Sequence, residues 1–268
     1  RKGRLSRSNA VFSIDPPTNE PVLEYRPGSD ERGRIKKELL RLRSSEMEIP
    51  LIIGGRPVET GNLGRCIIPH DHGHQLAIFH QAGKKEVSMA IEAATSAAGK
   101  WAAMDWDDRL AIFSRAADLI AGPRRMTLNA GTMLGQGKNV YQAEIDSACE
   151  IIDFLRFNAF YATQLYRQQP QSGPAEWNHL EYRPLEGFVF AVTPFNFTAI
   201  GGNLPSAPAM LGNTVLWKPA SSAVYSAWML METFIEAGLP PGVINFIAGS
   251  GARVGTPVLA SPALAGIH

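Results

Sequence analysis

The feature that most constrains the fold is an alternation of apolar runs and helical segments that begins near residue 187. Three apolar runs, GFVFAVT, TVLWKP and VINFIAG, are separated by stretches with helical periodicity, and a fourth run begins with AGIH. Apolar strands joined by helices are typical of parallel sheets covered on both faces. The pattern predicts an α/β fold with the first part of a doubly wound, Rossmann-like parallel sheet. Because the fourth run is so short, we expect the sequence to be cut off there rather than finished.

The region before residue 187 has helices and short β-runs instead of alternating units. In chain order, the predicted elements are an amphipathic helix over 30–45, a hairpin over 51–69, a strand over 75–82, and helices over 84–102, 107–121, 123–135 and 141–168. We therefore expect three parts: a basic leader without fixed structure over 1–20, a region of helices and a β-hairpin over 21–186, and the start of the sheet domain over 187–268.

Charge and cysteine content narrow the classes of partner and environment. The net charge of +1 gives no reason to expect nucleic acid or an anionic membrane surface as a partner. No apolar run approaches the roughly 18 residues that a membrane-spanning helix needs. Cys66 and Cys149 lie far apart and form no CxxC pair, so we expect buried, reduced thiols in a reducing compartment.

The first residues, RKGRLSRSNAVFSI, are rich in Arg and Ser, with no acidic residue before Asp15. This composition fits the tail of a mitochondrial targeting segment. It fits a basic leader in a partial sequence equally well.

Two other segments suggest binding sites only weakly. The cluster HDHGHQ at 70–75 brings three histidines together but no Cys or carboxylate constellation, so a loop with hydrogen-bonding histidines and no metal is the better interpretation. The segment GSGARVG at 249–255 follows a strand and opens a helix, but its spacing is one residue longer than the common dinucleotide fingerprint. A glycine turn into a closely packed helix explains it at least as well.

Polar residues follow two of the predicted parallel strands. Asn196 lies at the end of GFVFAVT-PFN, and Lys218 ends TVLWKP. Ligands of open α/β sheets bind at the carboxyl ends of the strands, so both side chains are expected to line one crevice. Asn196 could donate to an oxyanion or cap the following helix. Lys218 could bind a ligand or extend to the surface.

The segment TPFNFTAIGGNLPSAPAMLGNTVLWKP resembles the core of the aldehyde dehydrogenase superfamily, where an aromatic-Asn-aromatic turn is followed by a strand ending in Lys-Pro. PFNFTAIGGNL is typical of the Δ1-pyrroline-5-carboxylate dehydrogenase branch. The resemblance continues upstream through HGH, GPRRMT at 122–127, GQGKNVYQAEID at 135–146, DFLRFNAFYA at 153–162 and LEGF at 185–188.

The resemblance implies an aldehyde dehydrogenase fold, of which this chain is the N-terminal half. It also implies the activity of the branch, which is the NAD-dependent oxidation of L-glutamate γ-semialdehyde to L-glutamate in proline catabolism. The reaction proceeds through a thiohemiacetal on a cysteine, hydride transfer to NAD and hydrolysis of the thioester. Two alternatives stay open: an aldehyde dehydrogenase of another substrate, and a truncated, non-catalytic protein that binds nucleotide or subunits.

The resemblance assigns cofactor contacts to residues at both strand ends. Thr193, with Pro194 and Phe195 of the following turn, matches the segment that contacts the nicotinamide half of NAD. Lys218 matches the lysine that hydrogen-bonds the adenosine ribose. Ser221 stands where many superfamily members carry a Glu that grips the ribose hydroxyls, so a preference for NAD over NADP rests on the branch.

The resemblance also assigns the catalytic and substrate-binding residues that this sequence contains. Asn196 matches the oxyanion-hole asparagine, and Phe197 matches an aromatic wall of the aldehyde pocket. Glu150 matches an acidic position near the substrate entrance.

The nucleophilic cysteine and general-base glutamate of the family lie downstream of a motif like the one at which this sequence ends. Neither Cys66 nor Cys149 is in the position of the nucleophile, so the chain by itself is expected to be inactive. The resemblance further implies a homo-oligomer for the parent protein. Its location would be the mitochondrial matrix, or the cytoplasm if the source is bacterial.

Overall fold

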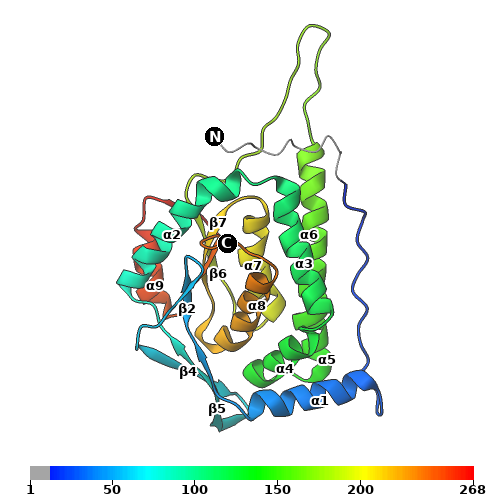
Figure 1. The fold of residues 1–268 in the computed structure, drawn as a ribbon, viewed down its shortest axis with the longest axis vertical. Helices are drawn as coiled ribbons and strands as arrows, with labels where there is room; N and C mark the ends of the chain where they lie inside the picture. Colours follow the sequence, from blue (N-terminus) through cyan, green and yellow to red (C-terminus); the bar gives the residue numbers. More distant parts are fainter. Residues whose placement is uncertain (1–12) are drawn as a thin grey trace.

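The computed structural model describes residues 13–268, and Figure 1 shows a sheet enclosed by helices. Four strands of this sheet run parallel in the order β8-β7-β6-β9. They are β6 (Phe188–Val192), β7 (Thr214–Lys218), β8 (Ile244–Phe246) and β9 (Leu264–Ile267). The helices that join them are α7 (Thr198–Met210), α8 (Val224–Glu236) and α9 (Gly251–Leu259). The predicted α/β class and the parallel strands are confirmed.

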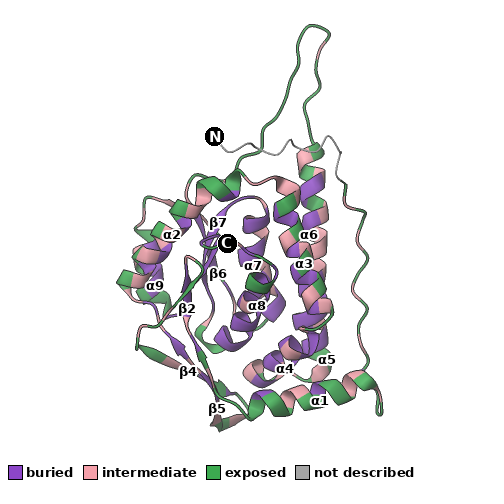
Figure 2. Ribbon diagram, in the orientation of Figure 1, coloured by how far each residue is buried: buried purple, intermediate pink, exposed green. Residues whose placement is uncertain are grey.

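Helices cover both faces of the parallel strands, which explains why these strands are apolar throughout. On one face, α2 (Lys84–Ala102) packs against β7 and α9. On the other face, α7 and α8 pack together, with α3 (Trp106–Ala121) behind them. Trp217 of β7 is fully buried, and its ring lies 5.2 Å from that of Phe246 and 6.4 Å from that of Phe234, centroid to centroid. Figure 2 shows this buried core between the helices.

The predicted hairpin is present, and it extends the large sheet. Strands β2 (Leu51–Ile53) and β3 (Arg56–Val58) are antiparallel, and β2 pairs with β8 in the antiparallel sense. The turn residues Gly54 and Gly55 have φ values of +59° and +75°, as a two-residue hairpin of this kind requires. The sheet is therefore mixed at this edge. The predicted domain boundary between residues 186 and 187 stays a prediction. The pairing of β2 with β8 joins the parts of the chain on its two sides.

A second, smaller sheet contains β1 (Met47–Ile49), β5 (Asp71–His80) and β4 (Leu63–Ile68), in that order. The prediction that residues 70–75 form a loop is wrong, because β5 begins at Asp71 and not near residue 75. Two register shifts in β4, around Ile67, let the histidine segment pair with that strand. Polar residues can occupy such a strand because its start is mostly exposed.

Most of the predicted helices in the first part of the chain are confirmed. The helix α1 (Asp30–Arg43) begins after Ser29, whose hydroxyl accepts a hydrogen bond from the Arg32 amide. Both α2 and α3 lie within one residue of their predicted bounds. The helix α4 (Arg125–Gln136) ends at Gly137, which has φ of +67°. Pro123 precedes this helix instead of occupying its first turn.

The long helix predicted over 141–168 is divided into three segments. A short α5 (Val140–Ala143) leads into a π-helical segment, η1 (Glu144–Cys149), and then into α6 (Glu150–Arg167). A wider turn changes which side chains face the core, so η1 buries the polar residues Glu144, Asp146 and Ser147. Apolar periodicity gave no indication of this segment.

The predicted leader over 1–20 lies largely outside the described residues, which begin at residue 13. Its last residues are extended along α6 and bound to the protein: Asn19 donates to the Asp153 carboxylate at 2.7 Å, and so does the Glu20 amide. Between α6 and β6 the chain protrudes as a long excursion without helix or strand (Figure 1). None of the helices in residues 13–268 has both the length and the apolar composition to span a membrane.

Candidate functional site

The carboxyl ends of β6 and β7 lie side by side and bring Thr193 next to Lys218. Val192 pairs with Lys218 in the parallel register. Just beyond, the Thr193 amide donates to the Lys218 carbonyl at 3.2 Å, and the Trp217 indole donates to the Thr193 hydroxyl at 3.1 Å. These contacts fix the Thr193 side chain next to the end of β7. The expectation that both strands lead to one edge of the sheet is confirmed.

Lys218 is buried, and only 7% of it is exposed. The alternative that it extends to the surface is therefore wrong. Burial lowers the pKa of its ammonium group. The ammonium has three N–H donors, and within residues 13–268 it makes a single hydrogen bond, to the Pro219 carbonyl at 3.0 Å. It can therefore bind a further acceptor. Ser221, three residues later, is exposed at the start of the short 3₁₀ helix η2 (Ser221–Ala223).

The turn after β6 presents Asn196 to the surface instead of burying it. Asn196 is exposed, and so are Phe195, at 67%, and Phe197, at 39%. The residue that caps α7 is Phe197, so the interpretation of Asn196 as a helix cap is wrong. The Asn196 amide has no hydrogen-bond partner in the described part of the chain. Its N–H groups are free to donate to a ligand.

A cavity of about 240 Å³ lies against this turn. Its lining residues are Pro69, Gly135, Gln136, Lys138, Phe195, Asn196 and Ser222. A second, narrow cavity borders it and is lined in part by Thr193, Pro194 and Phe197. The predicted oxyanion donor and the predicted cofactor turn therefore share one hollow region at the end of the parallel strands.

Sequence reasoning missed two residues of this region, Lys138 and Asp146. The Lys138 ammonium forms an ion pair with Asp146 and donates to the Asn196 backbone carbonyl at 2.5 Å. It also lies 4.4 Å from the centroid of the Phe197 ring. Both residues are in the segment GQGKNVYQAEID, which resembles the family, but nothing in its spacing shows that a helix turn brings them to Asn196.

Glu150, the first residue of α6, lies close to this pair. Burial and the neighbouring Asp146 carboxylate raise its pKa, while the positive charge of Lys138 opposes the shift. The structure thus places Glu150 within electrostatic reach of the Asn196 region, and its role at a substrate entrance stays a prediction.

The two cysteines are free, buried thiols, as predicted. Burial raises the pKa of each thiol to about 12, so neither forms a thiolate readily near neutral pH. The surroundings of Cys149 are polar: the Arg125 guanidinium donates to its sulfur at 3.4 Å, and Glu144 lies beside it.

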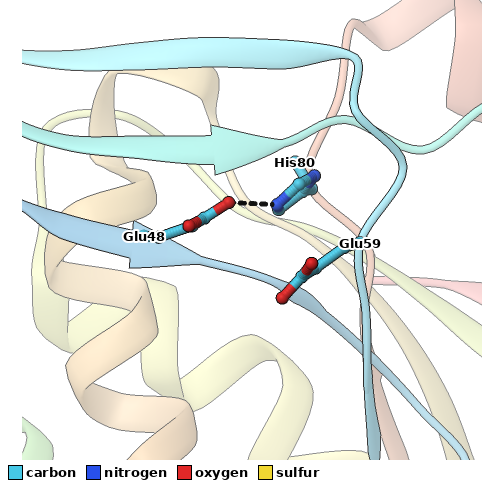
Figure 3. A group of neighbouring side chains, drawn as sticks. All are labelled: Glu48, Glu59 and His80. Atoms are coloured by element: carbon cyan, nitrogen blue, oxygen red, sulfur yellow. Dashed lines mark hydrogen bonds and ion pairs between the residues drawn. The ribbon is translucent and has the colours of Figure 1, made fainter.

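A group of Glu48, Glu59 and His80 has the side-chain types of a metal site (Figure 3). Its hydrogen bonds argue against that use. The Nδ1 atom of His80 accepts from the amides of Thr60 and Gly61 at 2.9 and 3.1 Å, so it carries no proton. The proton is then on Nε2, which donates to Glu48 at 2.9 Å and has no lone pair left for a metal ion. His80 therefore ties β5 to β1.

Comparison with known proteins identifies the family of this chain. The family model described as "Aldehyde dehydrogenase family" matches residues 59–268. The chain belongs to the aldehyde dehydrogenase family.

Several relatives within the family are named Δ1-pyrroline-5-carboxylate dehydrogenases. The one from Agaricus bisporus is 50% identical over 97% of this chain and 48% of its own length. The human mitochondrial one is 48% identical over 93% of this chain and 44% of its own. A crystal structure of the Mycobacterium tuberculosis enzyme bound with NAD matches with a TM-score of 0.96 and 50% identity, covering 97% of this chain and 49% of that one.

The chain spans about half the length of these relatives. The match covers the strand ends, the Asn196 turn and the segment with Lys138 and Asp146. The predicted aldehyde dehydrogenase fold is therefore confirmed for the residues present.

Proposed function

We propose that this protein is an aldehyde dehydrogenase that oxidises L-glutamate γ-semialdehyde to L-glutamate with NAD, in proline catabolism. One observation carries the proposal: an unpaired amide, on Asn196, and a buried ammonium with free donors, on Lys218, follow the carboxyl ends of two adjacent parallel strands. Membership of the family and relatives with the named activity support it.

Asn196 is the oxyanion donor of this proposal. Its exposed amide borders the cavity of about 240 Å³, where an aldehyde oxygen can approach it. As a nucleophile attacks the carbonyl carbon, negative charge develops on that oxygen, and a preorganised N–H donor stabilises it. Removing such a donor typically lowers kcat by about 10²- to 10³-fold.

The residues at the strand ends fit the assignment of an NAD site. The buried Lys218 ammonium has donors left for a ribose hydroxyl, and Ser221 adds an exposed hydroxyl nearby. Thr193, Pro194 and Phe195 would hold the nicotinamide half next to the Asn196 turn. NAD, when bound, supplies the acceptor for the hydride.

Phe197 and Glu150 are proposed to contact the substrate. Phe197 exposes part of its ring beside Asn196, which suits the methylene chain of the aldehyde. Glu150 offers a carboxylate to the ammonium group that L-glutamate γ-semialdehyde carries. The proposed reaction needs a nucleophile other than Cys66 and Cys149, because both thiols are buried and their pKa is raised to about 12.

The test is NADH formation by protein expressed from the complete coding sequence. We expect L-glutamate γ-semialdehyde to be oxidised with a higher kcat/KM than propanal or hexanal, and NAD to be preferred to NADP. Asn196→Ala should lower kcat by about 10²- to 10³-fold. Residues 1–268 expressed alone should form no NADH. Binding of nucleotide without oxidation of any aldehyde would contradict the proposal and favour the non-catalytic alternative.

We further propose that the protein is a homo-oligomer without nucleic-acid or membrane partners. Relatives from Dictyostelium discoideum and human are named mitochondrial, which supports the matrix as the location for a eukaryotic source. A bacterial source would place the protein in the cytoplasm. Light scattering tests the oligomeric state, and cell fractionation tests the location.

A further inference from the structure

We propose that Lys138 and Asp146 are positioning residues that fix the backbone of the Asn196 turn and thereby aim its amide. This inference goes beyond the roles assigned above and rests on the proposed function of Asn196. Within the turn, the Asn196 side chain has no partner among the described residues, whereas two side chains hold the backbone that follows it, at the Asn196 carbonyl and at the amides of Thr198 and Ala199.

Lys138 binds the turn at the peptide unit that directly follows the Asn196 side chain. Its ammonium donates to the Asn196 carbonyl at 2.5 Å and lies 4.4 Å from the Phe197 ring centroid. The Lys138 side chain is only 16% exposed, so this charge is partly shielded from water. A cation held over an aromatic face in such a setting restrains the ring as well as the carbonyl.

Asp146 binds the turn two residues further along the chain, where α7 begins. One carboxylate oxygen accepts from the Thr198 amide and the other from the Ala199 amide, both at 3.4 Å. These amides belong to the first turn of α7, which receives no side-chain cap from its own N-cap residue, Phe197. A carboxylate at this position also interacts favourably with the helix dipole. The 5% exposure of the Asp146 side chain leaves it little freedom to move away.

The ion pair between Lys138 and Asp146 joins these two contacts into one clamp. Lys138 holds the carbonyl of Asn196 itself, and Asp146 holds the amides two and three residues later. The backbone that follows the Asn196 side chain is therefore fixed from the Asn196 carbonyl to the start of α7. Catalytic groups lose large factors in rate when they shift by about 1 Å, of the order of 10²-fold. We therefore expect the clamp to act on the rate through the position of the Asn196 amide.

A double-mutant cycle with Lys138→Met and Asn196→Ala tests this in the complete protein. In the Asn196 background, Lys138→Met should lower kcat by about 10- to 100-fold and change KM for NAD less than about twofold. In the Asn196→Ala background, the same change should lower kcat less than about twofold, because the amide that it positions is gone. Equal losses in both backgrounds would overturn the proposal.

Three further variants control for folding and charge. Lys138→Arg keeps the cation and should retain most of kcat, while Lys138→Gln replaces Lys138→Met if that variant does not fold. Arg124→Met removes ion pairs to Glu232 and Glu236 of α8 at the start of α4, the end opposite to Gln136, which lines the cavity. It should leave kcat unchanged.

Hydrogen–deuterium exchange separates this inference from the proposed function, because it needs no turnover. The peptide covering 193–200 should exchange faster in Lys138→Met and in Asp146→Asn than in wild type, and Arg124→Met should match wild type. Unchanged exchange in the first two variants would overturn the clamp. If the wild-type protein oxidises no aldehyde, the proposed function fails, and the exchange result alone decides the clamp.

Discussion

Glu144 and Asp146 are two residues apart in η1, and both are buried, yet they hold two very different parts of the molecule. Glu144 accepts from Arg125, from the Tyr25 hydroxyl at 2.7 Å and from the Leu23 amide at 2.9 Å, and so ties the extended N-terminal segment to α4. Asp146 binds Lys138 and the start of α7, at the edge of the candidate site.

The two clusters also differ in how completely they are closed. The Glu144 carboxylate is fully buried and is surrounded by donors, which include the Asn129 amide at 2.7 Å. Such a closed network contributes to stability, because removing one partner leaves a buried charge uncompensated. The Asp146 cluster opens on the cavity through Lys138, so its main effect should be on the position of site residues.

The largest expected effect comes from breaking the closed cluster. Arg125→Met removes the guanidinium that binds Glu144, Glu20 and the Pro21 carbonyl, and should lower the free energy of unfolding by about 3 to 5 kcal/mol. Chemical denaturation measures this loss. Adding Glu144→Gln should recover part of it. A loss below about 1 kcal/mol in the single variant would show that the Glu144 cluster is not a closed, buried network.

The second-largest effect expected is that of acid, which should weaken the same Glu144 cluster. Burial alone would raise the pKa of Glu144, but hydrogen bonds from Arg125, Tyr25 and the Leu23 amide together outweigh burial and lower that pKa. A carboxyl whose pKa is lower in the folded state stabilises the fold above its unfolded pKa, about 4.3, and loses this contribution as pH falls through the folded value.

The stability difference between wild type and Glu144→Gln should therefore be constant from neutral pH to about 5 and should shrink below about 4. Urea denaturation across this pH range measures it. A difference that stays the same down to pH 3 would show that Glu144 does not titrate as described.

A smaller effect on stability is expected at the open cluster. Asp146→Asn keeps a side-chain acceptor for α7 but loses the ion pair with Lys138, and should cost about 1 kcal/mol, a typical value for a helix cap. Thermal unfolding compares it with Arg125→Met. A loss as large as that of Arg125→Met would remove the distinction between the two clusters.

The smallest effect concerns Cys149, whose thiol lies inside the closed cluster. With a pKa raised to about 12, it should not react with a thiol reagent at pH 8 in the native wild-type protein. Arg125→Met, which opens the cluster, should make it reactive. Rapid labelling of native wild type would show that the segment around Pro21 detaches.

The parallel sheet was predictable, and so was the position of Asn196 and Lys218 beyond the carboxyl ends of two adjacent strands, because both depend on local patterns. Apolar runs separated by helices specify parallel strands, and a residue at the end of such a strand lies at the ligand-binding edge. The hairpin position followed from Gly54-Gly55. Its pairing with β8 did not, because that contact joins segments nearly 200 residues apart.

The clamp on Asn196 was not predictable for a related reason. Lys138 precedes a helix, and Asp146 lies in a turn whose width depends on its hydrogen bonds, so neither residue carries a periodic signal. Asn196 is exposed because β6 ends at Val192, four residues earlier, and the chain turns outward before α7. The charged residues of η1 are buried because partners from distant segments neutralise them, which no local pattern reveals.

The π-helical segment has a consequence for mutations that change the length of the chain. A π-helical turn contains about one residue more than an α-helical turn, so deleting one residue within 144–149 to give a regular helix would leave α6 facing nearly the same way relative to α5. Deleting Ile145 would make Glu144 and Asp146 adjacent, about 100° apart around the helix axis, so they could not both keep their partners. Substitution of Glu144 or of Asp146 would affect one cluster, whereas this deletion would affect both without turning α6 away.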